Sequence, residues 1–326
     1  MNTLGILKAR VLAIHPARRR GHAALIDQLS RLAPRLIFEA GSDPVVRLSD
    51  EGMSFTGFWS DDAARILHAS MPAEIRKAIP ARYFRLARDV LTRFIYPHMR
   101  PDLKPEGYAP AQMIGFHGQH KDAIADLADP FARDKLLAAF RPKPGDIMLD
   151  GGAFVGFGAL ATSRAMPGGR IIAVEAAGAC FRLLKKNIET NGASETIAPV
   201  HAALWSTPGE RTLKREFAQA ASLIDDVVPE GKDETVETTT IDHLVERFKL
   251  ERLDMLSLTI NGAEIAALDG ARQTLRTLRP RIRLAGWYQV DGRPIATQAA
   301  RRLEAAGYQV FVGPRGNVLG LPMARQ

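Results

Sequence analysis

An acidic residue followed at once by closely spaced glycines constrains this chain more than any other feature. Residues 145–158 read GDIMLDGGAFVGFG, so a short apolar run ends at Asp150 and four glycines follow within eight residues. So many glycines in one turn cost conformational entropy, which favours a close approach of bare main chain to a ligand over a tight turn that binds nothing. The pattern predicts a strand over IMLD, a glycine turn, and a helix over residues 155–165.

Strand-like and helix-like segments alternate through the rest of the chain. Further strands are expected at RIIAVE, IAPVHAAL, DMLSLTI and RIRLAGW, and YQVFVGPRGNVLGLP is expected to close the chain as a hairpin. Helices are expected at GACFRLLKKNIETNG, DHLVERFK and TQAARRLEAAG, and AEIAALDGARQTLRTL is expected to form one continuous helix. This alternation predicts a doubly wound, mostly parallel sheet with helices on both faces and an antiparallel edge at the hairpin.

The first third of the chain has a different composition. A stretch rich in proline, glycine and charge, PHMRPDLKPEGYAP, ends at Pro110 and predicts a boundary between residues 1–110 and 111–326. Before it, RLIFEA predicts a strand and residues 61–99 have a helical pattern. We expect an accessory domain or extension here, either α/β or mainly helical.

Positive charge is concentrated in that first third. Of a formal net charge of +8, residues 1–110 contribute +6, from 17 Lys and Arg against 11 Asp and Glu. Such an excess could attract nucleic acid, an acidic membrane surface, or a phosphorylated or acidic-sugar substrate. The charges are scattered through helical patterns without an RNA-binding signature, which favours a solvated arginine-rich surface.

Cysteine content and hydropathy suggest a cytoplasmic protein. Cys180 is the only cysteine, so no intramolecular disulfide can form, and its helical context suggests a half-buried thiol. Lys8 and Arg10 interrupt the apolar N-terminus, which argues against a signal peptide. No apolar run in the sequence is long enough to cross a bilayer.

The charge at the strand ends separates two cofactor classes. A dinucleotide site would use a G-x-G-x-x-G/A turn, which GFGALA at 156–161 matches only loosely and too far beyond the strand. Asp150 would lie near a pyrophosphate in such a site, whereas S-adenosylmethionine carries an ammonium and a sulfonium that an acid favours. Glu175 ends the next strand, 25 positions later, where a carboxylate can accept hydrogen bonds from both ribose hydroxyls. Asp150 therefore favours S-adenosylmethionine over NAD, whereas Glu175 supports an adenosine ligand of either class.

Five segments together resemble the FkbM family of class I S-adenosylmethionine-dependent methyltransferases. They occur in the family's order over about residues 130–290: DGGAFVG, IIAVEA, LLKKNIETNG, TTTIDHL and DMLSLTINGAEIAALDGA. The resemblance implies a Rossmann-like sheet of seven strands and methyl transfer, usually to a hydroxyl of a sugar or of a natural-product scaffold. It implies that the cofactor's methionine part is cradled by Asp150, Gly152, Ala153 and Gly156, that Glu175 holds the ribose, and that Ala202 and Ala203 lie near the adenine.

The fourth strand departs from the family's pattern, which usually reads Lys-x-Asp-x-Glu-Gly-Ala-Glu. This chain has Ser257, Thr259 and Asn261 at the three charged positions, and only Glu264 keeps its acid. Neutral groups orient an acceptor but accept its proton poorly at neutral pH. Alignment and desolvation can nevertheless supply much of the rate of an in-line methyl transfer. We expect Thr259 and Asn261 to contact the acceptor and Glu264 to act either in the site or as an acid in the first turn of a helix.

Histidines are the other candidates for a general base. His117 and His120, in GFHGQH, precede the cofactor-binding region, and a loop there could cover the acceptor. We include His120 among the catalytic candidates. His-x-x-His without a third ligand is a poor metal signal, so no metal site is expected.

The sequence predicts a methyltransferase of EC class 2.1.1 that uses S-adenosylmethionine to methylate a hydroxyl of a small-molecule or glycan acceptor. Two alternatives from other classes are a catalytically reduced cofactor-binding regulatory protein and a nucleic-acid methyltransferase that binds through its basic first third. The oligomeric state does not follow from the sequence.

Overall fold

The computed structural model describes residues 33–41, 44–49, 53–57, 65, 68–69, 71, 73–84, 86–87, 140, 142–217, 220–223, 232–286, 288–312 and 318–324. The chain divides into two compact units. Among the described residues, those up to position 87 belong to the first unit and those from position 140 belong to the second. Each unit is described by itself.

The first unit contains an antiparallel sheet of three short strands. These are β1 (Leu36–Glu39), β2 (Val45–Leu48) and β3 (Met53–Thr56), in the order β1-β2-β3. The helices are α4 (Ala73–Ala78) and the 3-10 turns η1 (Ala33–Arg35) and η3 (Ala81–Tyr83). Phe55, Ile75 and Phe84 are fully buried, so the unit has an apolar core of its own. The strand expected at RLIFEA is present as β1.

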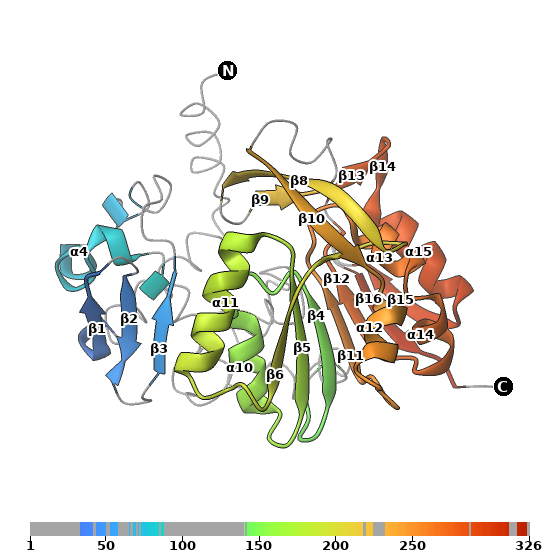
Figure 1. Cartoon of the computed structure of the whole chain (residues 1–326), viewed down its shortest axis with the longest axis horizontal. Helices are drawn as coiled ribbons and strands as arrows, with labels where there is room; N and C mark the ends of the chain where they lie inside the picture. Colours follow the sequence, from blue (N-terminus) through green and yellow to red (C-terminus); the bar gives the residue numbers. More distant parts are fainter. Residues whose placement is uncertain are drawn as a thin grey trace. The chain divides into compact units, whose positions relative to one another are not determined.

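A seven-stranded sheet forms the centre of the second unit (Figure 1). Its order is β15-β16-β12-β11-β4-β5-β6. The pairs β12-β11, β11-β4, β4-β5 and β5-β6 are parallel, and β16 is antiparallel to both of its neighbours. The strands are β4 (Ile147–Gly151), β5 (Arg170–Glu175), β6 (Ile197–His201), β11 (Met255–Leu258), β12 (Arg281–Leu284), β15 (Tyr308–Val312) and β16 (Val318–Pro322). The predicted Rossmann-like, doubly wound sheet with an antiparallel terminal hairpin is confirmed.

Helices cover both faces of this sheet (Figure 1). On one face lie α10 (Phe157–Ala165) and α11 (Gly178–Thr190). On the other lie α12 (Ile241–Arg247), α13 (Glu264–Asp269), α14 (Arg272–Thr277) and α15 (Ile295–Ala305), which pack against a core that includes Leu149, Leu256 and Ile282. Within the described parts of the chain, no helix is both long and apolar enough to cross a membrane.

Two expected elements are each broken in two. The helix expected over 263–278 is interrupted at Gly270, where a Cβ atom would come within 2.3 Å of the Trp205 carbonyl oxygen. Asp242 then accepts hydrogen bonds from the amides of Gln273 and Thr274 at the start of α14. The strand expected over 197–204 breaks at Ala202 into β6 and β7 (Ala203–Leu204).

The short strand β7 leaves the main sheet and joins a second one. This sheet has the order β7-β10-β8-β9, with β8 (Gly209–Phe217), β9 (Ala220–Ser222) and β10 (Lys232–Thr239). Figure 1 shows β8 and β10 as a long antiparallel ribbon beside the main sheet. The polar, β-prone segments of the sequence thus form a separate sheet, anchored next to β5 and β6.

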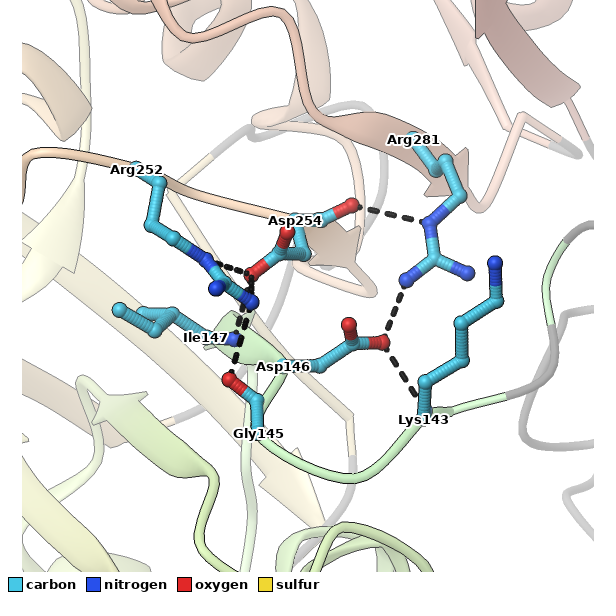
Figure 2. A network of polar contacts seen from close by, with 7 residues as sticks. All are labelled: Lys143, Gly145, Asp146, Ile147, Arg252, Asp254 and Arg281. Atoms are coloured by element: carbon cyan, nitrogen blue, oxygen red, sulfur yellow. Dashed lines mark hydrogen bonds and ion pairs between the residues drawn. The ribbon is translucent and has the colours of Figure 1, made fainter.

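Two aspartates and two arginines tie together the amino ends of the three central strands (Figure 2). Arg281 donates a hydrogen bond to Asp146 at 2.5 Å, and its Nε donates to the carbonyl oxygen of Asp254 at 3.1 Å. The side chain of Asp254 accepts from the amide of Ile147 at 2.8 Å and from Arg252 at 2.9 Å. Residues from β12, the segment before β11 and the start of β4 therefore hold one another in register.

Candidate functional site

The two predicted cofactor acids lie at the carboxyl ends of adjacent parallel strands. Asp150 is near the end of β4 and Glu175 is the last residue of β5, and both are buried. Asp150 lies beside Ala173 of β5. Glu175 is two residues further along β5, so it lies on the same face of the sheet as Asp150 and closer to the carboxyl ends of the strands. In open α/β sheets this edge is where ligands bind.

The fold itself explains why the turn after β4 needs glycine. Gly152 has φ 82° and Gly156 has φ 93°, both in the left-handed region. A Cβ atom on Gly152 would come within 2.0 Å of the Thr259 carbonyl oxygen, and one on Gly156 within 2.9 Å of the Leu184 side chain. Gly152 is therefore required by its contact with the main chain just beyond β11, and Gly156 is favoured by its left-handed conformation, whether or not a ligand approaches. Because Gly156 precedes the first turn, α10 begins at Phe157, two residues later than expected.

Four main-chain amides of this turn, those of residues 152, 153, 154 and 156, donate hydrogen bonds within the protein. The amides of Gly152 and Ala153 both donate to the Val174 carbonyl oxygen, at 2.9 and 3.0 Å. The amide of Phe154 donates to Glu175 Oε2 at 2.8 Å, and that of Gly156 donates to the Ala153 carbonyl oxygen. A phosphate site at such a turn uses amides that point at the ligand. This turn instead directs its amides at β5 and at itself.

Glu175 is the acid around which the turn is organised. Its Oε2 accepts from Phe154, and its Oε1 accepts from the amide of Ala177 at 2.9 Å. Burial raises the pKa of Glu175 to about 7, the charge of Asp150 adds to the rise, and the amide hydrogen bonds limit it. Each carboxylate oxygen has a second lone pair, so the side chain keeps acceptor capacity for a ligand hydroxyl.

Ala202 and His201 lie beside Glu175. The amide of Ala202 donates to the Glu175 carbonyl oxygen at 3.2 Å, so the predicted adenine-side residue is adjacent to the predicted ribose-side acid. His201 is exposed, stacks on Phe181 with ring centroids 4.6 Å apart, and contacts the Ala176 carbonyl oxygen through Nε2 at 3.1 Å.

The first two of the positions that carry charge in the family's fourth-strand pattern, Ser257 and Thr259, have different environments. Ser257 is buried, and its hydroxyl accepts a hydrogen bond from Arg283 Nε at 2.8 Å. Thr259 is exposed just beyond β11, and its amide donates to the Gly151 carbonyl oxygen at 2.9 Å. Thr259 thus lies against the glycine turn, which brings a predicted acceptor-side residue next to Gly152.

The remaining candidates form a turn between β11 and α13. Asn261 has φ 49° and Gly262 has φ 108°. Glu264 has no exposed surface, and it accepts from the amides of Ile260 at 2.9 Å and Gly262 at 2.8 Å. Burial raises the pKa of Glu264 to about 7, against the effect of these amide hydrogen bonds. The hydroxyl of Tyr288 donates to Asn261 Oδ1 at 3.3 Å.

His117 and His120 lie outside the described residues, so their role stays a prediction. Among the residues that the structure describes, no group of three or more His, Cys, Asp or Glu side chains could hold a metal ion. Asn187, on α11, is fully buried and donates to the Val155 carbonyl oxygen at 2.8 Å, which fixes the glycine turn to the helix.

Sequence reasoning missed two residues at this edge. Glu234, on β10, accepts a hydrogen bond at 2.9 Å from the amide of Gly178, 56 positions away, where α11 begins beside Glu175. Phe154 adopts φ 54° and delivers its amide to Glu175. No local signal marks Glu234, because its position depends on how the second sheet folds back. The glycines on either side of Phe154 predict the turn, but they do not indicate that the Phe154 amide binds Glu175.

Solved structures with a similar fold include several methyltransferases. The methyltransferase FkbM from Methylobacillus flagellatus KT is 13% identical with a TM-score of 0.41, over 79% of this chain and 58% of that one. Precorrin-6y C5,15-methyltransferase from Geobacter metallireducens is 18% identical with a TM-score of 0.36, over 60% of this chain and 89% of that one. An O-methyltransferase from Bacillus cereus in complex with SAH is 15% identical with a TM-score of 0.34, over 58% and 78%.

The model of the FkbM methyltransferase domain matches residues 150–310. The match begins at Asp150 and extends into β15, so it includes both strand-end acids, the glycine turn and the turn that leads to Glu264. No curated protein sequence matches the chain. The family match confirms the prediction of an S-adenosylmethionine-dependent methyltransferase family. Residues 150–310 of the chain form an FkbM methyltransferase domain.

Proposed function

We propose that this chain binds S-adenosylmethionine at the carboxyl ends of β4 and β5 and transfers its methyl group to a hydroxyl oxygen of an acceptor. The observation that carries the proposal is the glycine turn, whose amides at 152, 153, 154 and 156 are all engaged within the protein. A pyrophosphate would need such donors, whereas a cationic cofactor without phosphate is favoured by the negative charge of Asp150. When bound, the cofactor supplies a methyl group on a positively charged sulfonium.

The proposed roles follow from position. The residues that would surround the cofactor are Asp150, Gly152, Ala153, Gly156, Glu175 and Ala202. Asp150 would attract the positive charge of the cofactor, and Glu175 would accept hydrogen bonds from the ribose hydroxyls. Because Gly152 has no side chain, the cofactor could lie directly against the main chain of the turn. Thr259 and Asn261 would contact the acceptor, with His120 as a candidate base.

The acceptor that fits this arrangement is a hydroxylated small molecule or glycan. Thr259, Asn261 and Tyr288 are neutral hydrogen-bonding groups on the acceptor side, which suit hydroxyl groups better than a charged nucleophile. Alignment of the acceptor oxygen can supply much of the acceleration without a strong base on β11. We further propose that the basic residues 1–110 help to select the acceptor.

Titration calorimetry of the full chain tests the cofactor assignment. S-adenosylmethionine should bind saturably and NAD should not, and Asp150→Asn and Glu175→Gln should each weaken binding about tenfold or more. Asp291→Asn is the matched control, since Asp291 is an exposed acid at φ 52°, a conformation that asparagine tolerates. Absence of binding to the folded chain would remove the proposal.

Mass spectrometry of the reaction products tests the chemistry. The chain is incubated with S-adenosylmethionine and pooled sugars, polyols and phenols, and S-adenosylhomocysteine is measured with the methylated product. Product that is stable to base-catalysed ester hydrolysis supports an ether-forming O-methylation. Binding without turnover of any hydroxylated pool would favour the catalytically reduced alternative.

A further inference from the structure

The turn between β11 and α13 is built around a carboxylate. Both oxygens of Glu264 accept main-chain hydrogen bonds, one from Ile260 and one from Gly262, and these amides flank the peptide unit of Asn261 on either side. The amide of Asn261 also contributes to the field that stabilises this carboxylate. Amides that converge on one anion fix the backbone dihedrals of the residues between them.

This geometry does not suit a proton acceptor for substrate. A general base must come within hydrogen-bond reach of the group that it deprotonates. Glu264 is 0% exposed, and its two oxygens face the amides of its own turn. Both carboxylate oxygens therefore bind the main chain and do not face a substrate.

The residue held at the tip of this turn is Asn261. Its φ of 49° is a left-handed conformation that asparagine tolerates and that most side chains resist. Its Oδ1 accepts from the hydroxyl of Tyr288, which comes from the segment after β12. Two neighbouring segments at the carboxyl edge of the sheet thus hold Asn261: Glu264 fixes its backbone and Tyr288 binds its side-chain amide.

We propose that Glu264 is a positioning residue whose carboxylate closes the 260–262 turn and thereby orients the Asn261 amide toward the methyl acceptor. The acceptor would be recognised through a hydroxyl or carbonyl oxygen that the amide N–H group can reach. The proposal rests on the methyltransferase function proposed above, because it concerns the acceptor side of that site. Under this proposal Glu264, the one acid of the family's pattern that this segment keeps, positions the turn and does not transfer a proton.

The test uses the full chain and two readouts that need no known acceptor. The first is amide hydrogen exchange of the segment 259–265. The second is the side-chain amide signal of Asn261 in a nitrogen–proton correlation spectrum, identified by its loss in Asn261→Gly. Glycine accepts the φ of 49°, so Asn261→Gly removes the side chain and keeps the turn.

Glu264→Gln should speed exchange of 259–265 about tenfold or more, because a glutamine side chain can offer only one acceptor oxygen to the two amides. The same variant and Tyr288→Phe should each shift the Asn261 side-chain signal. Glu304→Gln, an exposed glutamate of α15, should change neither readout. Asn261→Gly should keep the slow exchange, which would separate the role of the turn from that of its side chain.

Two results would overturn the proposal. One is a folded Glu264→Gln variant with wild-type exchange and an unmoved Asn261 signal. The other is an Asn261→Gly variant that exchanges as fast as Glu264→Gln, since the side chain would then hold the turn. Should Glu264→Gln fail to fold, Gly262→Ala strains the same turn at φ 108° with the carboxylate in place, and an unmoved Asn261 signal there is equally decisive. Calorimetry with S-adenosylmethionine on the wild type reports separately on the proposed function.

Discussion

Gly152 lies directly against the main chain of Thr259, so closely that a Cβ atom on Gly152 would come within 2.0 Å of the Thr259 carbonyl oxygen. The amide of Thr259 donates to the neighbouring Gly151 carbonyl oxygen at 2.9 Å. The turn after β4 and the turn after β11 are therefore in direct contact, with no room for a side chain between them. This contact joins the proposed cofactor side to the proposed acceptor side.

Gly152→Ala should destabilise the protein by about 3 kcal/mol or more, because the methyl group meets backbone that cannot move aside and because φ 82° is unfavourable for alanine. Denaturant unfolding measures the loss, and calorimetry should show S-adenosylmethionine binding weakened at least about tenfold. Gly158→Ala is the matched control. It lies in α10 with no atom within 4 Å of its Cβ position, so alanine should leave stability unchanged or raise it by up to about 1 kcal/mol. Equal effects of the two substitutions would contradict this account.

Arg281→Met should cost about 3–5 kcal/mol, because it leaves the buried carboxylate of Asp146 without its ion-pair partner. The side chains of this pair, whose contact is drawn in Figure 2, are only 14% and 7% exposed. Arg252→Met removes an arginine that is 56% exposed, and it should cost about 1 kcal/mol or less. Both changes lie at the amino edge of the sheet, away from Asp150, so S-adenosylmethionine affinity should stay within about twofold in the folded variants.

The double variant Asp146→Asn with Arg281→Met tests whether the pair acts as a unit. Its loss of stability should be clearly smaller than the sum of the two single losses, because the second change removes a charge that the first left unpaired. Additive losses would show that the two side chains act independently and that Arg281 stabilises the sheet through its bond to the Asp254 carbonyl oxygen alone.

The positions of Asp150 and Glu175 could be predicted from the sequence because each follows an apolar strand of recognisable pattern. Parallel strands place their carboxyl ends at one edge, so both acids had to meet there. The doubly wound architecture followed from the same alternation of strands and helices. The glycine turn was located correctly, but its reason was incomplete. Gly152 is needed because Thr259, 107 positions away, packs against it, and no local pattern reports such a contact.

The orientation of Glu264 could not be predicted from its position in the chain. An acid at the start of a helix can face solvent, a ligand or its own turn, and all three have the same sequence signal. The choice depends on the dihedral angles of Asn261 and Gly262, which bring the amides of residues 260 and 262 onto the carboxylate. The need for glycine at position 270 has a related origin, since the carbonyl group of Trp205, on another segment, lies within 2.3 Å of where a Cβ atom would be.

Binding of S-adenosylmethionine should release protons near pH 6.5. Burial and the charge of Asp150 raise the pKa of Glu175 to about 7 in the free protein, so a large fraction of this side chain carries a proton at that pH. A cationic cofactor nearby favours the ionised form, lowers the pKa and expels the proton. Affinity should accordingly rise with pH between about 5.5 and 8, by less than about tenfold.

Calorimetry in two buffers of different ionisation enthalpy measures the protons released. Glu175→Gln should bind more weakly, and its affinity should be flat over the same range of pH. Glu237→Gln, an exposed acid of β10, should keep the wild-type proton release. Undiminished release in Glu175→Gln would assign the proton to a different group.

Stability should fall as the pH rises from 5 to 8, and Glu264 should account for part of the fall. Burial raises the pKa of Glu264 from 4.5 to about 7, so between these values the folded state binds more protons than the unfolded state. The sign is opposite to that of a carboxylate in a surface ion pair: the contribution is full below pH 4.5 and is lost as the pH rises through 7. One such group changes the free energy of unfolding by on the order of 2 kcal/mol over this range. Denaturant unfolding should show a shallower dependence of stability on pH for Glu264→Gln than for the wild type. The control Glu304→Gln should keep the wild-type slope. Parallel curves for all three proteins would mean that Glu264 has the same pKa in the folded and unfolded states.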